Sequence, residues 1–163
     1  MKYQKILAAL DNSPLGKVVF EQALAMAKYN EAALMLFHCL PMETKVTAPY
    51  TSLYEGEFSD FSYLMREQLE TQATETKKWL TNYGEIAREQ GVPTEWDWKI
   101  GEAGRWIRDQ AKSWDADLIV VGRRGLKGVS EMFLGSVSNY IVHHSPCSVL
   151  VVQGEMIPET KLN

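Results

Sequence analysis

The chain has few of the residues from which disulfide scaffolds and metal centres are built. Its two cysteines, Cys39 and Cys147, lie far apart in sequence and show neither a CxxC pattern nor a Cys/His ligand spacing. Disulfide frameworks and zinc modules place such residues at short, regular intervals. We therefore expect reduced thiols within the core of a protein from a reducing compartment, the cytoplasm.

Long apolar runs and an excess of positive charge are also missing. No run approaches the ~20 residues of a membrane-spanning helix, and the apolar stretch near the N-terminus ends at Asp11, too early for a signal peptide. The net charge of −4 gives no broad basic surface, so nucleic acid is not an expected partner. These features favour a cytoplasmic protein that contacts neither membrane nor nucleic acid.

Catalytic patterns are equally scarce. No Ser/His/Asp order, metal-ligand cluster or pair of carboxylates stands out. His38 ends an apolar stretch and is interpreted as a core or edge residue, while His143 and His144 are neighbours on an expected helix and cannot share one of its faces. The tryptophans considered fall at packing positions, without basic partners that would suggest base stacking: Trp96, Trp98, Trp106 and Trp114.

What the sequence does contain is a regular alternation of short apolar runs with helical patterns. Strands are predicted over residues 4–10, 32–39, 94–100, 116–122 and 147–152, and helices from Ser13 and Pro14 onwards, over 103–114 and over 136–144. Ser13 suits a helix cap and Pro14 a first helical turn. Such alternation predicts a parallel α/β sheet with helices on both faces, a three-layer sandwich.

The middle of the chain does not follow this alternation of short strands and helices. Residues 41–58 contain two prolines and no sustained period, so a long loop is expected there. A long helix should follow and end near Gly91 as its C-cap. Its apolar face is predicted to hold Phe61, Leu64, Met65, Leu69, Ala73, Leu80, Tyr83 and Ile86. The length of the chain fits one domain over residues 1–153, followed by a short tail over 154–163.

One glycine-rich segment points to chemistry. Gly122, Gly125 and Gly135 followed by Ser136 form the spacing G-x2-G-x9-G-S, placed after an expected strand and opening an expected helix. Glycines let a ligand approach the backbone, and free N–H groups at a helix start favour an anion such as phosphate. Ser136 can add a hydroxyl donor, and Arg123 or Arg124 a charged fork. Neither a Walker A loop nor G-x-G-x-x-G is present.

These residues and their surroundings resemble the ATP-binding type of the universal stress protein family. The resemblance rests on "KILAALDNS", "LMLFHC", "GEAGRWIRDQAKSWDADLIVVGRRG" and "LGSVSNYIVHHSPCSVLVV", and is weak over residues 41–60. It implies a Rossmann-like five-stranded parallel sheet in the order 3-2-1-4-5. It also implies a homodimer joined through the last strand, Ser148 to Val152.

The resemblance further implies a nucleotide site. It assigns Asp11 to the neighbourhood of the adenosine and the metal-linked phosphates, with Mg²⁺ or Mn²⁺ accompanying ATP, ADP or AMP. Ala9 and Cys39 line the adenine pocket, where the family often has proline and valine. The remaining contacts are expected from the first loop, from the segment around ribose and phosphates, and from the second helix start: Ser13, Val121, Gly122, Arg124, Gly125, Gly135, Ser136 and Val137.

Three functions are compatible with this pattern. The first is an ATP-binding regulatory protein of the stress response that hydrolyses ATP slowly or not at all and switches an unidentified protein partner. The second is an enzyme that adenylates or phosphorylates a substrate, which the short first loop "DNSPLG" disfavours. The third is a dimeric scaffold without nucleotide, which the intact glycine motif disfavours.

Overall fold

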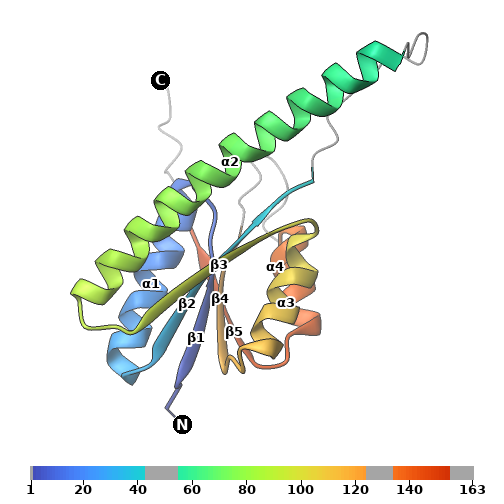
Figure 1. Ribbon diagram of the computed structural model, residues 1–163. Helices are drawn as coiled ribbons and strands as arrows, with labels where there is room; N and C mark the ends of the chain where they lie inside the picture. Colours follow the sequence, from blue (N-terminus) through green and yellow to red (C-terminus); the bar gives the residue numbers. More distant parts are fainter. Residues whose placement is uncertain (1, 43–54, 124–133, 155–163) are drawn as a thin grey trace, which may run out of the picture.

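The fold is taken from a computed structural model that describes residues 2–42, 55–123 and 134–154, with the side chains of 55–61 left aside. Strands and helices alternate along the chain, as predicted (Figure 1). The elements are β1 (Lys5–Ala9), α1 (Pro14–Asn30), β2 (Ala33–Leu40), α2 (Glu55–Glu89), β3 (Thr94–Ile100), α3 (Ala103–Ser113), β4 (Leu118–Arg123), α4 (Ser136–His144) and β5 (Ser148–Gln153).

The five strands form one parallel sheet in the order β3-β2-β1-β4-β5, which confirms the predicted topology. Central β1 pairs with β2 on one side and β4 on the other, with Ile6 in register with Leu34 and Leu118. The chain therefore leaves the sheet in opposite directions at β1 and β4. In open parallel sheets a crevice opens at such a point, beyond the carboxyl ends of the strands.

Two apolar clusters hold the three layers together. Successive side chains of a strand point to opposite faces, so fully buried Ile6 and Ala8 join the cluster under α1 and α2, whereas Leu7 joins the one under α3 and α4. Figure 1 shows α1 and α2 on one side of the sheet and α3 and α4 on the other. The central strands are apolar on both faces, as strands covered on both sides must be.

Local signals set two of the helix ends. The hydroxyl of Ser13 accepts a 3.0 Å hydrogen bond from the backbone N–H of Gly16, and Pro14 occupies the first turn of α1. At the end of α2, Gly91 has φ of 82° and its N–H bonds the carbonyl of Arg88. Both caps are confirmed, because each needs a residue type that the sequence supplies at that position.

The start of α2 was predicted too late in the chain. The helix begins at Glu55, so residues 55–58 belong to it and not to the expected loop. After Pro49 no proline occurs before Pro93, hence nothing in the backbone prevents an early start. Residues 43–54 of that loop lie outside the described part of the chain.

The second half of α2 packs on the sheet. Leu80 is fully buried, and Tyr83 and Ile86 pack against the cluster under α1 and α2. Leu64, placed on the same apolar face by the sequence pattern, is instead 62% exposed. The physical reason is length: 35 residues of helix span about 50 Å, whereas the strands are far shorter, and Figure 1 shows α2 projecting past the sheet.

Some packing predictions need correction. Trp106 is 38% exposed, with its indole N–H donated to the carbonyl of Ile100 at 3.1 Å, so it is a surface residue of α3. Both cysteines are half-buried and not enclosed in the core. Trp96, Trp98 and Trp114 do pack against the apolar clusters. Within the described residues, no helix has the length and apolar character needed to cross a bilayer.

Candidate functional site

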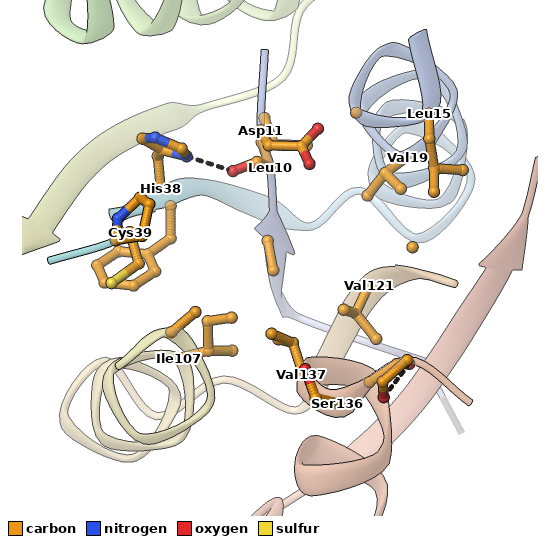
Figure 2. Close-up of a pocket in the computed structure, with 18 of the residues that line it drawn as sticks. Leu10, Asp11, Leu15, Val19, His38, Cys39, Ile107, Val121, Ser136 and Val137 are labelled. Atoms are coloured by element: carbon orange, nitrogen blue, oxygen red, sulfur yellow. Dashed lines mark hydrogen bonds between the residues drawn. The ribbon is translucent and has the colours of Figure 1, made fainter. Parts of the chain in front are cut away.

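A cavity of about 290 Å³ opens at the carboxyl edge of the sheet, between β1, β2 and β4 and the ends of three helices (Figure 2). We call it the edge cavity. Its size is at the lower end of the roughly 300–1,000 Å³ of small-molecule sites. It lies where β1 and β4 diverge, the position at which ligands bind in parallel sheets of this kind.

Most of the site residues expected from the sequence meet in this cavity. The members of that set on its wall are Ala9, Asp11, Cys39, Val121, Gly122, Gly135, Ser136 and Val137. Ser13 is not on the wall; its hydroxyl bonds Asp11 and the N–H of Gly16 within the first loop. Arg124 and Gly125 lie outside the described residues, so the middle of the glycine motif is not placed.

The loop after β1 forms the acidic side of the cavity. The hydroxyl of Ser13 donates a short hydrogen bond to the carboxylate of Asp11 and caps α1 at the same time. Gly16, in the first turn of α1, also lines the wall, and a Cβ atom there would lie 2.0 Å from the Asp11 carbonyl oxygen. The loop can pass this close to the helix only because residue 16 is glycine.

The start of α4 forms a second polar side. Its N-cap is Gly135, which has no side chain with which to cap the helix, and the first backbone bond of the helix runs from Asn139 N–H to the Gly135 carbonyl. The N–H groups of Ser136, Val137 and Ser138 precede that bond, so they receive no partner from within the helix. Exposed N–H groups and the positive end of the helix dipole favour an anion here.

Gly122 at the end of β4 has a packing role that the motif did not indicate. A Cβ atom on it would lie 3.0 Å from the side chains of both Leu15 and Val19 of α1. Its backbone lines the cavity while its Cα faces the first helix. A larger residue here would push the side chains of Leu15 and Val19 aside, so the close contact between β4 and α1 favours glycine whatever occupies the cavity.

The opposite wall is apolar. Cys39 at the end of β2 faces Ile107 of α3 across the cavity (Figure 2), and its thiol donates to the Gly101 carbonyl at 3.3 Å. Burial raises the pKa of this thiol, so it stays protonated near neutral pH. Ala103 completes this wall from the first residue of α3. Sequence reasoning missed the contribution of 101–107, since nothing in a lone glycine before a helix distinguishes a ligand wall from a turn.

His38 is another wall residue that the sequence did not indicate. Its Nδ1 lies 2.7 Å from the carbonyl oxygen of Leu10, and its ring meets Trp79 edge-on at 5.1 Å between centroids. Burial lowers the pKa of His38, opposed by the bond to Leu10 and by the charge of Asp11. The sequence-based interpretation of a hydrogen-bonded edge histidine is confirmed, but its position beside the cavity comes from the fold alone.

A model of the universal stress protein family matches residues 2–153, nearly the whole chain. The chain belongs to the universal stress protein family. Among the relatives of this universal stress protein is Universal stress protein Sll1388 of Synechocystis sp., 52% identical over 153 residues. The alignment covers 94% of this chain and 99% of the relative.

Solved structures share the fold. Universal stress protein UspA from Lactobacillus plantarum superposes with a TM-score of 0.75 at 23% identity, over 93% of this chain and 99% of its own. A universal stress protein in complex with cAMP superposes with a TM-score of 0.61 at 20% identity, over 94% of this chain and 98% of its own. The universal stress protein from Archaeoglobus fulgidus in complex with dAMP superposes with a TM-score of 0.62 at 21% identity, over 93% of this chain and 98% of its own.

Metal-binding capacity at the site is small. Among the described residues, no group of three or more His, Cys, Asp and Glu side chains converges on one point. Asp11 contributes one carboxylate to the cavity wall. His143 and His144 lie on the exposed surface of α4 in this universal stress protein, where His144 bonds the carbonyl of Tyr140 and stacks on its ring.

Proposed function

We propose that this universal stress protein binds an adenine nucleotide, ATP above all, in the edge cavity and acts as a nucleotide-dependent regulator. One observation carries the proposal: an apolar wall, a carboxylate and the open start of a helix surround a single cavity at the point where β1 and β4 diverge. The relatives whose structures are described as complexes with cAMP and dAMP support adenine nucleotides as the ligand class.

The walls suggest how the ligand would lie. The adenine ring belongs against the apolar side, made by Ala9, Cys39 and Ile107. The phosphates belong at the start of α4, where Ser136 can donate a hydroxyl beside backbone N–H groups that have no partner within the helix. Arg124 and Gly125 are proposed as further phosphate contacts on the pattern of the motif alone.

Mg²⁺ or Mn²⁺ is proposed to enter with the phosphates. A hard divalent ion takes oxygen ligands and is commonly held by one or two carboxylates plus phosphate oxygens. Asp11 fits that role as a single carboxylate on the cavity wall, and no cluster of the described residues offers a complete cage. Asp11 would hold the ion beside the first loop, and the ion would supply charge neutralisation for the phosphates.

Regulation is favoured over catalysis because the wall carries groups that bind and few that transfer protons. Asp11, His38 and Cys39 are the titratable side chains on the described wall. The Nδ1 atom of His38 is bound to the Leu10 carbonyl, and burial raises the pKa of the Cys39 thiol. Any ATP hydrolysis should therefore be slow. Rapid pyrophosphate release that depends on an added substrate would assign the protein to the ATP-using enzymes.

Titration calorimetry with Mg-ATP tests the binding proposal, with Mg-GTP and Mg²⁺ alone as controls. We expect a 1:1 site that prefers the adenine nucleotide. Mass spectrometry of small molecules released from the denatured protein adds a test without a chosen ligand. A protein that neither retains nor binds an adenine nucleotide contradicts the proposal and supports a nucleotide-free scaffold.

We also propose that the protein forms a homodimer through β5. This strand lies at the edge of the sheet, and the backbone groups of one side of Ser148–Gln153 have no neighbouring strand in the described part of the chain. An open edge is a template for pairing with another strand, and a two-fold axis allows two copies to pair antiparallel. Light scattering at micromolar concentration should give twice the mass of the chain; a monomer there would refute the dimer.

A further inference from the structure

His38, on the wall of the edge cavity, is hydrogen-bonded to the loop that carries Asp11. The backbone ladder between β1 and β2 ends with the pair Ala9 and Phe37, after which the N–H of Leu10 still bonds the Phe37 carbonyl at 2.8 Å. The next acceptor, one residue past the end of β1, is the Leu10 carbonyl. No backbone donor takes it in the described structure; the Nδ1 atom of His38 does, at 2.7 Å.

The chemistry of this contact fixes the state of the ring. A carbonyl oxygen only accepts, so Nδ1 must carry the proton and donate it, and the neutral ring has its lone pair on Nε2. The ring is held from its other side by the edge-on contact with Trp79, which in turn meets Tyr83 at 5.9 Å. His38 is thus fixed by aromatic packing and uses one nitrogen to hold the chain.

The residue that His38 holds is adjacent to the acidic group of the site. Leu10 directly precedes Asp11, and the loop is restrained from the far side by the Ser13 hydroxyl and by the close approach of Gly16. Just before Asp11, Leu10 bonds two residues of β2, through its N–H to the Phe37 carbonyl and through its carbonyl to the ring of His38. Losing the His38 donor would remove one of these two bonds and free the Leu10 carbonyl, which belongs to the peptide group that leads into Asp11.

We propose that His38 is a positioning residue for Asp11: its Nδ1 donor sets where the carboxylate meets the metal–phosphate part of the bound nucleotide. This rests on the proposed function. Both His38 and Cys39 reach the edge cavity, but the ring of His38 packs on Trp79 of α2, whereas Cys39 lies with Ile107 of α3 on the apolar wall proposed for the base. The affinity for phosphate-bearing ligands should therefore depend on the Nδ1 donor, and the affinity for adenosine should not.

Three substitutions separate the donor from the ring. His38→Asn places an amide N–H where Nδ1 stood, His38→Gln carries the same amide one carbon further away, and His38→Phe keeps an aromatic ring against Trp79 without any donor. Mg-ATP and adenosine are titrated into each variant, and thermal melting reports the fold. We expect His38→Asn to keep its affinity for Mg-ATP within about two-fold of wild type. His38→Gln and His38→Phe should bind Mg-ATP about five-fold more weakly, which is the effect of losing one hydrogen bond.

The outcomes are distinguishable. Wild-type protein that binds no Mg-ATP overturns the proposed function and this inference with it. Wild-type binding with unchanged affinity in Gln and Phe overturns the inference alone, as does an Asn variant that loses as much as Gln. Equal weakening of adenosine and Mg-ATP would show that His38 acts on the whole cavity by packing, and would also overturn it. If Phe fails to fold, the Asn and Gln pair decides.

Discussion

Gly16 and Asp11 lie so close that a methyl group on the Cα of Gly16 would sit 2.0 Å from the carbonyl oxygen of Asp11. No real Cβ contact is that short, so the first turn of α1 and the loop after β1 fit together only with glycine at this position. Beside this contact, Asp11 and Gly16 both line the wall of the edge cavity. A single glycine therefore links the start of a helix to the acidic side of the site.

Replacing Gly16 with alanine should displace this loop. The obstructing atom belongs to the backbone and cannot rotate away, so we expect a loss of stability of about 1–3 kcal/mol, as for other overpacked sites. Mg-ATP affinity should fall as well. Urea unfolding measures the first effect and calorimetry the second.

Gly84→Ala is a suitable control for that experiment. Gly84 is also helical and buried, but its Cβ would lie 3.3 Å from a side-chain atom of Trp96, which can shift. Its stability should stay within about 1 kcal/mol of wild type, since alanine also favours the helix. Equal stability in both alanine variants would mean that the loop adapts to residue 16.

The two serines at the start of α4 should respond in opposite ways. Ser136 is exposed on the cavity wall, whereas Ser138 is 1% exposed and donates to the Gly135 carbonyl at 3.1 Å. Ser136→Ala should leave the melting temperature unchanged and weaken Mg-ATP binding two- to ten-fold, about one hydrogen bond. Ser138→Ala should lower stability by about 1 kcal/mol. Identical Mg-ATP affinity in wild type and Ser136→Ala would remove Ser136 from the site.

A bound nucleotide should protect Cys39 from alkylation. Its thiol lies on the apolar wall, while the half-buried Cys147 packs beside β4 and bonds Ser145, away from the cavity wall. Burial raises the pKa of both thiols, so labelling is measured at alkaline pH by mass spectrometry. Mg-ATP should slow labelling at Cys39 and leave Cys147, the control in the same chain, unchanged. Equal rates at Cys39 with and without nucleotide would contradict the assigned base position.

Stability should fall as His38 is forced to take up a proton. Burial holds the pKa of His38 below its ordinary value of 6.5, so between the two pKa values the unfolded chain binds more protons than the folded one. The contribution of neutral His38 to the free energy of unfolding is therefore complete above pH 6.5. It is lost progressively as the pH falls toward the pKa of His38 in the folded protein. Between pH 7.5 and pH 5.5, the free energy of unfolding should fall more for the wild-type protein than for His38→Asn. A parallel decline in the two proteins would place the proton uptake elsewhere.

Much of the fold could be predicted from local patterns. The strands at Leu118–Arg123 and Ala33–Leu40 are apolar runs of the right length, and Ser13 and Gly91 mark helix ends by chemistry that acts over a few residues. The start of α2 could not be predicted in the same way. Residues 41–58 contain two prolines and show no sustained apolar period, so periodicity gave no sign of where the helix begins.

The candidate site, like the fold, could be predicted from the sequence only in part. The glycine spacing and the position of Asp11 after a strand indicated the cavity, because carboxyl ends of parallel strands meet at one edge. The wall formed by Gly101 and Ile107 and the bond from His38 to Leu10 were not predictable, since they join residues from different elements. Gly122 was assigned to the motif, and the structure adds a packing role against Leu15.

Local patterns along the chain were enough to predict the class of fold, the helix caps at Ser13 and Gly91 and the residue types that can hold an anion, since each of these depends on residues close together in the sequence. Tertiary structure decided which of these residues share a cavity and which restrain one another. His38 is 28 positions from Leu10 in the chain, yet the parallel pairing of β1 and β2 brings them to 2.7 Å. Such distances follow from the packing of the whole sheet, which no local pattern contains.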